Sequence, residues 1–264
     1  MEEAARAFYG GAMSFHRLMF ACAALAVAVD ALLPVPALAG AAKRQVVVEL
    51  FTSQGCASCV PADALLGQFA ITRHDVIALS LPVTYWDMLG WKDTLASDGC
   101  TKRQKSYAQF MGRGGVYTPQ MIVDGITDVV GGRDGQVNAA IIARAGDEQD
   151  VPVTITSNPH EVRVVIGSAD DKGDYNATVW MFRVLPQASV SITAGENAGH
   201  TLAYRNVVRD IKSIGLWKGQ AMTIDLPQDY PSHDPIAVIV QQNGYGRILG
   251  AALVADNSVK AQPH

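Results

Sequence analysis

The feature that most constrains this sequence is a pair of cysteines, Cys56 and Cys59, placed between an apolar run and a helical pattern. The run Gln45–Thr52 (QVVVELFT) is continuous and rich in β-branched residues, which predicts a buried strand. From Cys59 to Phe69 the apolar residues recur at helical spacing, and Pro61 lies where a first helical turn tolerates proline. We therefore expect the cysteine pair at the start of a helix that follows a buried strand.

That position gives the pair its expected chemistry. Unpaired amides and the positive end of the helix dipole stabilise a thiolate, so the pKa of such a cysteine falls from about 8.5 to between about 3.5 and 7.5. Cys56, at the exposed start of the helix, is the expected nucleophile, and the more buried Cys59 would resolve the mixed disulfide. The tetrapeptide by itself also fits a structural disulfide or half of a metal site.

The rest of the chain divides at the polar stretch 146–150. Before it, the patterns predict a strand at 75–81, an irregular aromatic segment at 82–91, a helix at 97–111, a β-hairpin at 120–130 and a helix at 135–144. After it, alternating patterns separated by Pro, Gly, Asn and Asp predict strands at 151–156, 162–166, 177–185, 190–193, 222–226, 236–241 and 247–254. The stretch 204–215 fits either a short helix or another strand.

These elements predict an α/β fold in two parts. We expect an α/β domain at 40–146, with a mixed sheet and flanking helices, followed by a β-sandwich-like domain at 151–256 and a flexible tail at 257–264.

The N-terminus has the pattern of an export signal at 1–39. Arg17 precedes an apolar stretch at 18–33, and Ala37-Leu38-Ala39 supplies the small residues that signal peptidase requires. Because Asp30 interrupts the apolar stretch, we expect cleavage and no membrane span afterwards. A periplasmic or secreted location follows. The net charge of −4 and the lack of a basic run argue against a nucleic-acid partner.

Three further features of the sequence are candidates to act together with the cysteine motif. Thr118-Pro119 directly precedes the predicted strand at 120–123, and Glu49 lies in the otherwise apolar strand before the cysteines. Tyr85 and Trp86 belong to the aromatic segment and are candidates to line a peptide groove beside the cysteines, or to anchor the loop.

Several runs in this chain together resemble a known family. They are VVVELFTSQGCASCVPAD, YWDMLGWKD, TKRQKSYAQ, VYTPQMIVDG, GENAGHTLAYRNVV and GRILGAA. They resemble exported bacterial proteins of the domain of unknown function 1223, over about residues 45–254. The resemblance implies a thioredoxin-like fold for the first domain and an inferred thiol–disulfide role.

In thioredoxin-like folds a cis-proline faces the cysteine pair, which implies a cis bond at Thr118-Pro119 and a role for Thr118 in presenting its backbone to substrate. Thioredoxins often carry a buried acid that exchanges a proton with the resolving thiol, and Glu49 is the residue in this sequence that we assign to that role. Cys100 is expected to be a buried, unreactive residue rather than a third redox thiol, and Arg103 and Gln104 are expected on a solvated helix face.

The sequence therefore predicts an exported thiol–disulfide oxidoreductase that acts on protein thiols or a redox partner protein. No cofactor and no metal are expected, because electrons pass between thiols. Two alternatives stay open at this stage. A thiolate pair can bind Cu(I), as in a metallochaperone, and the chain can be a non-catalytic interaction module with a static Cys56–Cys59 disulfide.

Overall fold

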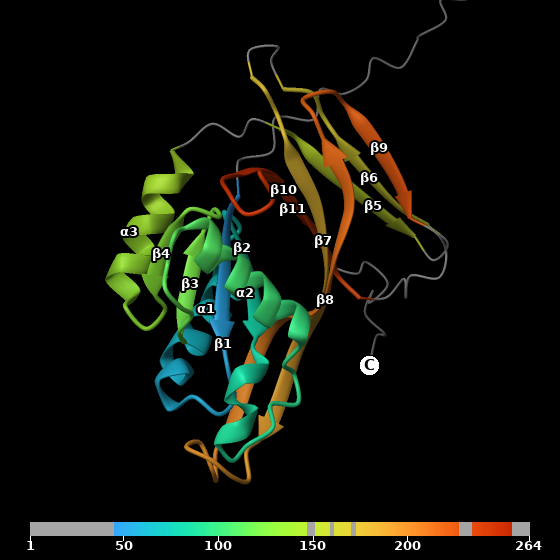
Figure 1. Ribbon diagram of the computed structural model, residues 1–264. Helices are drawn as coiled ribbons and strands as arrows, with labels where there is room; N and C mark the ends of the chain where they lie inside the picture. The colour runs from blue at the N-terminus through green and yellow to red at the C-terminus, as the bar shows by residue number, and fades with distance from the viewer. Residues whose placement is uncertain (1–44, 147–150, 159–160, 170–172, 227–233, 255–264) are drawn as a thin grey trace, which may run out of the picture. The chain divides into compact units, whose positions relative to one another are not determined.

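The structure is a computed structural model that describes residues 45–254 except 147–150, 159–160, 170–172 and 227–233 (Figure 1). The expected signal at 1–39 and tail at 257–264 lie outside the described residues, as does most of the expected linker. The elements are β1 (Val46–Thr52), η1 (Ala57–Cys59), α1 (Val60–Thr72), β2 (Val76–Pro82), η2 (Thr84–Leu89), α2 (Asp98–Phe110), β3 (Gln120–Val123), β4 (Thr127–Val130), α3 (Asp134–Ala145), β5 (Val153–Asn158), β6 (Glu161–Ile166), β7 (Ala177–Ser191), β8 (Thr201–Trp217), β9 (Met222–Leu226), β10 (Ile236–Gln242) and β11 (Ile248–Val254).

The N-terminal elements form close to their predicted bounds. Every residue of β1 and of β2 is buried, as expected for apolar runs inside a sheet. The side chain of Ser97 accepts a hydrogen bond from the Cys100 N–H and so begins α2 as an N-cap. The aromatic segment is not wholly irregular, because it contains the short 3₁₀ helix η2.

The C-terminal half differs from prediction at its longest hairpin. The strands expected at 177–185 and 190–193 are one strand, β7, and the ambiguous stretch at 204–215 belongs to the strand β8. β7 and β8 pair antiparallel from Ala177↔Trp217 to Ser191↔Thr201. This long ladder supplies backbone partners along both strands, and it decides against a helix in β8.

The strands of both halves form one mixed sheet in the order β11-β10-β7-β8-β2-β1-β3-β4. β1 pairs parallel with β2 and antiparallel with β3. β8 joins the edge of β2 through the parallel pair Ser80↔Val207, and the Asn206 side chain donates a hydrogen bond to the Ala78 carbonyl (2.9 Å). The described residues all belong to one compact unit, while the division into two domains stays a prediction.

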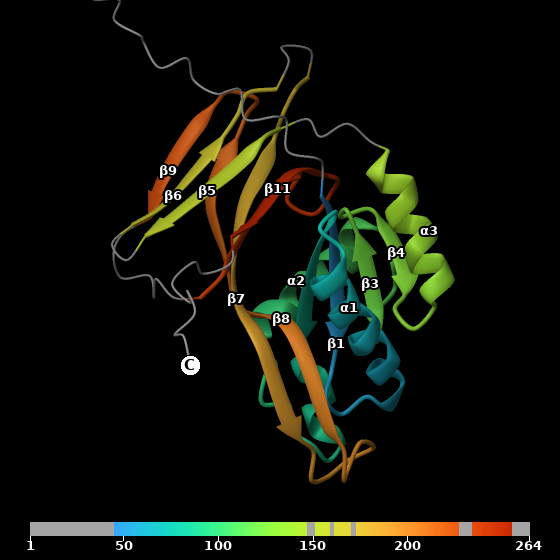
Figure 2. The ribbon, with the colours of Figure 1, turned by 180° about the vertical axis from the view of Figure 1, so that it is seen from behind.

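Helices α1 and α3 cover one face of this sheet, and α2 covers the other face (Figures 1 and 2). Val46, Val48 and Leu50 of β1 share a core with residues of α1 and α3. Val47 and Phe51 point the other way and share a core with residues of α2 and of the C-terminal strands. Because strand side chains alternate, Glu49 lies on the α2 face of β1.

A second sheet, in the order β5-β6-β9, completes the C-terminal part. Its strands share a buried core with β7 and β10, including Ile166 of the small sheet and Val179 and Val238 of the large one. Trp217 at the end of β8 is fully buried in this core, and its indole N–H donates to the Gly167 carbonyl (3.1 Å). The small sheet therefore packs on the part of the large sheet that the C-terminal strands form.

Candidate functional site

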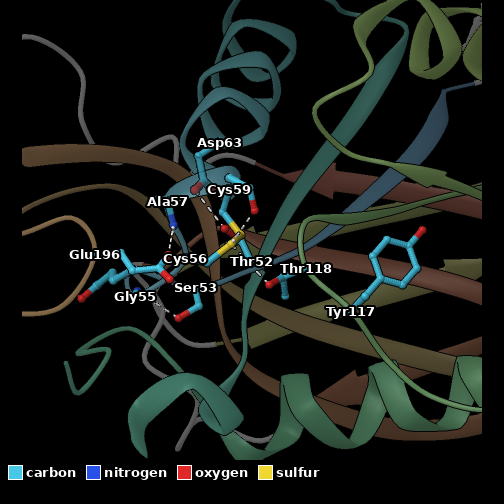
Figure 3. Close-up of a disulfide and its surroundings, with 12 residues drawn as sticks. Thr52, Ser53, Gly55, Cys56, Ala57, Cys59, Asp63, Tyr117, Thr118 and Glu196 are labelled. Carbon is cyan, nitrogen blue, oxygen red and sulfur yellow. Dashed lines mark hydrogen bonds between the residues drawn. A yellow bond between two sulfur atoms is a disulfide. The ribbon is translucent and has the colours of Figure 1, made fainter. Parts of the chain in front are cut away.

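Cys56 and Cys59 form a disulfide at the start of the first helix (Figure 3). The two Cα atoms are 5.3 Å apart. Backbone hydrogen bonds from Cys56 N–H to the Ser53 carbonyl and from Cys59 N–H to the Cys56 carbonyl, both 3.1 Å, shape the turn that leaves β1. Cys56 precedes η1, and α1 follows directly after Cys59. The local prediction of strand, cysteine pair and helix is therefore confirmed.

Both cysteines are completely buried, which corrects the expectation that Cys56 is exposed at the start of the helix. The Thr118 hydroxyl donates to Cys56 Sγ, and the Ser58 hydroxyl lies at the same distance from it, 3.4 Å. On another side, the Ala57 N–H donates to the exposed carboxylate of Glu196 (2.9 Å). Segments distant in the sequence therefore contact the cysteine loop.

Thr118 and Pro119 occupy the position that the motif order predicts. The Thr118-Pro119 peptide bond is cis, and the Thr118 side chain contacts the sulfur of Cys56 (Figure 3). The Pro119 carbonyl accepts a hydrogen bond from Gly131 N–H (2.9 Å), which ties this loop to the end of β4. The role of Thr118 in presenting its backbone to a substrate stays a prediction.

Tyr85 and Trp86 lie in η2 and are half-buried. A Cβ placed on Gly55 would lie 3.8 Å from Trp86 Cβ, so Trp86 packs beside the cysteine loop. Burial raises the pKa of the Tyr85 phenol, while the side chains of Gln104 and Thr118 act in the opposite direction. Both aromatic residues therefore lie next to the disulfide site, while their contact with a substrate stays a prediction.

Glu49 is fully buried, and its partners come from α2. The Arg103 guanidinium pairs with both carboxylate oxygens, and the Tyr107 hydroxyl donates to Glu49 Oε2 (2.5 Å). Arg103 also donates to Gln241 Oε1 on β10 (3.0 Å). The expectation that Arg103 and Gln104 lie on a solvated face is wrong, because they are 2% and 0% exposed. Arg103 can be buried because its guanidinium pairs with the buried carboxylate of Glu49 on β1.

Asp63 is a second buried carboxyl group, on the first turn of α1 and beside the disulfide in Figure 3. Its Oδ2 accepts a hydrogen bond from the Thr52 hydroxyl (2.9 Å). Its Oδ1 is buried and has no hydrogen-bond partner among the residues that the structure describes. Burial raises the pKa of Asp63 well above its usual value, opposed by the Thr52 hydrogen bond and helped by the charge of Asp93.

Asp63 also lines a groove of about 370 Å³ between α1 and β8. Val60, Ala64 and Ile71 contribute apolar surface from α1, and Leu202 does so from β8. The groove therefore begins beside Val60, the residue that follows Cys59.

Comparison with known proteins identifies the family. Residues 47–241 match the family described as a protein of unknown function, DUF1223. The chain belongs to this family. No curated protein sequence matches the chain.

Two solved structures are similar to this DUF1223 protein. One is protein AGR_C_4864 from Agrobacterium tumefaciens, which is 35% identical, with a TM-score of 0.72 over 84% of this chain and 98% of that one. The other is HBP35 of Porphyromonas gingivalis, which is 14% identical, with a TM-score of 0.59 over 84% of this chain and 79% of that one. The second likeness shows a shared fold and nothing more.

Sequence reasoning missed the polar residues that this DUF1223 protein uses to hold the cysteine loop. Gln54 donates its N–H to Asp93 (2.8 Å), accepts from the Trp91 indole (2.8 Å), and accepts at its carbonyl from Asn197 (2.9 Å). Asp93 also accepts from the N–H of Leu95 (2.8 Å). The family-like runs contain Gln54, Trp91, Asp93 and Asn197, and that was the available signal.

Cys100 lies apart from the disulfide as a free, buried thiol. It packs in the core on the α2 face of the sheet, and burial raises its pKa to about 12. Across the described part of the chain, no group of three or more His, Cys, Asp or Glu residues is arranged to hold a metal ion. Within the same residues, no helix is long and apolar enough to cross a membrane.

Proposed function

We propose that this DUF1223 protein is an exported, thioredoxin-like thiol–disulfide oxidoreductase whose redox pair is Cys56 and Cys59. The observation that carries the proposal is a closed disulfide at the start of a helix, with Thr118 of a cis Thr-Pro step hydrogen-bonded to the sulfur of Cys56. The order β2-β1-β3-β4, with β1 and β2 parallel, supports the thioredoxin-like assignment. The N-terminal pattern at 1–39 supports export to the periplasm or beyond.

The reaction balances as two exchanges of sulfur. The Cys56 thiolate attacks a substrate disulfide, forms a Cys56–substrate disulfide and releases one substrate thiolate. The Cys59 thiolate then attacks the Cys56 sulfur, closes the Cys56–Cys59 disulfide and releases the second thiolate. The substrate gains two electrons, the cysteine pair loses two, and the released thiolates take protons from solvent.

Asp63 is the group that we propose to accept the proton of Cys59. It lies four residues after Cys59, on the first turn of the same helix, and one of its oxygens has no partner among the described residues. Because burial raises the pKa of Asp63, this carboxylate is a stronger base than an ordinary aspartate, which favours its accepting a proton from the thiol. The charge of Glu49 is already paired with Arg103, so Asp63 fits this role better than Glu49 does.

A reduction assay with mixed-disulfide trapping tests the proposal. Wild-type protein with dithiothreitol should accelerate insulin reduction, while Cys56→Ser and Cys59→Ser should not. Cys59→Ser should accumulate a mixed disulfide through Cys56. Cys100→Ser is the matched control, because that thiol is buried in the core, and it should behave as wild type. Equal activity of wild type and both active-site variants would refute the proposal.

Asp63→Asn separates the proton step from the rest of the reaction. We expect slower resolution, so that the mixed disulfide accumulates in a variant that retains both cysteines. Resolution at the wild-type rate would remove Asp63 from the mechanism and leave the cysteine chemistry in place.

The complete burial of both sulfurs favours a second candidate, a static disulfide in an interaction module. The two candidates differ in how the folded protein meets a reductant. A redox pair is reduced by excess dithiothreitol without loss of the fold, whereas a static buried disulfide is reduced only as the protein unfolds. Thiol quantification together with circular dichroism distinguishes these outcomes.

A further inference from the structure

The tip of the β7–β8 hairpin, residues 192–200, lies against the loop that carries the disulfide. Two side chains of the tip make the contact. Glu196 accepts a hydrogen bond from the Ala57 N–H, and Asn197 donates one to the Gln54 carbonyl, each at 2.9 Å. Figure 3 shows Glu196 reaching the residue next to Cys56. The tip comes from a part of the chain about 140 residues away from the cysteines.

The backbone of the tip is built to hold these two side chains in place. Ile192 N–H donates to the His200 carbonyl (2.8 Å), and His200 N–H donates to the Asn197 carbonyl (3.1 Å). Gly195 has φ +76° and lies so close to Trp91 that a Cβ there would be 3.1 Å from Trp91 Cβ. A residue with a side chain is disfavoured at that position. Glu196 is therefore presented by an ordered turn and not by a loose loop.

The contact places a negative charge where the reactive thiolate needs positive potential. Ala57 N–H is the first amide after Cys56, and amides at this position stabilise a thiolate. Here that amide donates to the exposed carboxylate of Glu196. Opposing this, the Thr118 and Ser58 hydroxyls contact the sulfur of Cys56.

Two other carboxyl groups near the loop, those of Asp63 and Asp93, are buried. Burial raises the pKa of Asp63 and also that of Asp93, although three backbone N–H groups donate to Asp93. Glu196 differs from both because its side chain is exposed.

We propose that Glu196 is a positioning residue that weakens the stabilisation of the Cys56 thiolate, and so sets the pair to act as a reductant of substrate disulfides. The inference rests on the proposed function and adds the direction of electron transfer, from the cysteine pair to the substrate. A pair whose reduced form is stabilised by an acidic thiol is an oxidant. A carboxylate at the same place destabilises the thiolate, so the dithiol passes its two electrons to a substrate disulfide more readily. A protein dithiol then returns two electrons to the Cys56–Cys59 disulfide and becomes a disulfide itself.

The test compares Glu196→Gln and Glu196→Ala with wild type in equilibrium with reduced and oxidised glutathione. Glu196→Gln removes the charge and keeps an acceptor for the Ala57 N–H, while Glu196→Ala removes both. We expect the equilibrium to shift toward the reduced protein by about threefold to tenfold. A tenfold shift corresponds to a reduction potential that is about 30 mV less negative. The pKa of Cys56, followed by thiolate absorbance in the reduced protein, should fall by about half a unit or more.

Two controls separate this effect from a loosened hairpin. Glu161→Gln removes a carboxylate from β6 and should leave the potential unchanged. Loosening that affects the oxidised and reduced forms equally changes the rate of reduction by opening access to the sulfur, but it does not move the equilibrium potential. The difference between Glu196→Gln and wild type should also shrink at about 1 M salt, where charges are screened within about 3 Å.

The failures of the two proposals are distinguishable. If wild-type protein exchanges with glutathione but Glu196→Gln and Glu196→Ala keep its potential and thiol pKa, the role of Glu196 is refuted and the oxidoreductase stands. A shift toward a more negative potential in either variant refutes it as well. If the folded wild-type disulfide does not exchange at all, the oxidoreductase proposal is overturned, and the role of Glu196 with it.

Discussion

Replacing Glu49 with Gln should remove the charge that compensates a completely buried guanidinium. Arg103 is 2% exposed and lies within 5.6 Å of four aromatic ring centres, those of Tyr107, Phe182, Trp180 and Tyr245. After the substitution its remaining polar partners are neutral, namely the Tyr107 hydroxyl (3.1 Å) and Gln241 Oε1 (3.0 Å). A charge that deep in the protein lacks the solvation it has in water.

The expected cost is about 3–5 kcal/mol of the free energy of unfolding, the range for breaking a buried ion pair by removing one partner. That is a large part of the roughly 5–15 kcal/mol that stabilises a typical domain. Arg103→Met should cost less, because the buried carboxyl group left behind can become neutral by binding a proton. The double variant Glu49→Gln/Arg103→Met should cost less than the sum of its single changes, because it leaves neither charge buried without its partner.

Urea unfolding of the oxidised protein, analysed as a double-mutant cycle, measures these values. A coupling energy of at least about 2 kcal/mol is expected from the contact between the two side chains. This account of a buried ion pair is refuted if the free energy of unfolding of Glu49→Gln lies within about 1 kcal/mol of the wild-type value. It is refuted equally if the effects of the two single changes simply add. The same variant tests the predicted proton role of Glu49, because its rate of mixed-disulfide resolution can be compared with that of Asp63→Asn.

Two further predictions concern buried titrating groups. The pKa of Asp63 is raised in the folded state, so the free energy of unfolding should fall as the pH rises from about 4 through the folded pKa. Asp63→Asn should flatten this decline in urea midpoints measured against pH, and an unchanged decline would contradict the assignment. Burial raises the pKa of Cys100 to about 12, so iodoacetamide should not label it in the native protein at mildly alkaline pH. Labelling as fast as that of a free thiol would contradict its burial.

Local sequence patterns were sufficient for most of the N-terminal elements and for the cysteine motif. Continuous apolar runs predicted β1 and β2, and helical spacing after Cys59 predicted α1, because side-chain periodicity reports the local backbone. The resemblance to thioredoxin-like folds, together with the order of motifs, also implied the cis bond before Pro119. The same reasoning left β8 undecided, since its residues fit a strand only when β7 is present to pair with them.

The tertiary structure alone decided which polar residues are buried near the cysteines and which partners they have. Arg103 looks like a surface residue in the helical pattern of α2, and only β1 and β10 supply the partners that allow its burial. Glu49 and Asp63 are both acids near the cysteines in sequence, but strand alternation sends one toward Arg103, and the first turn of α1 holds the other beside Thr52.

The sequence by itself therefore determined the chemistry that is available, a cysteine pair between a strand and a helix with a Thr-Pro step before the third strand. The fold decided how exposed and how charged that pair is. From the sequence alone, the Ala57 N–H is one of the amides at the start of a helix. In the fold it donates a hydrogen bond to Glu196, which lies at the tip of a hairpin 139 positions away. Local periodicity carries no information about such a contact, because it depends on how the sheet brings distant segments together.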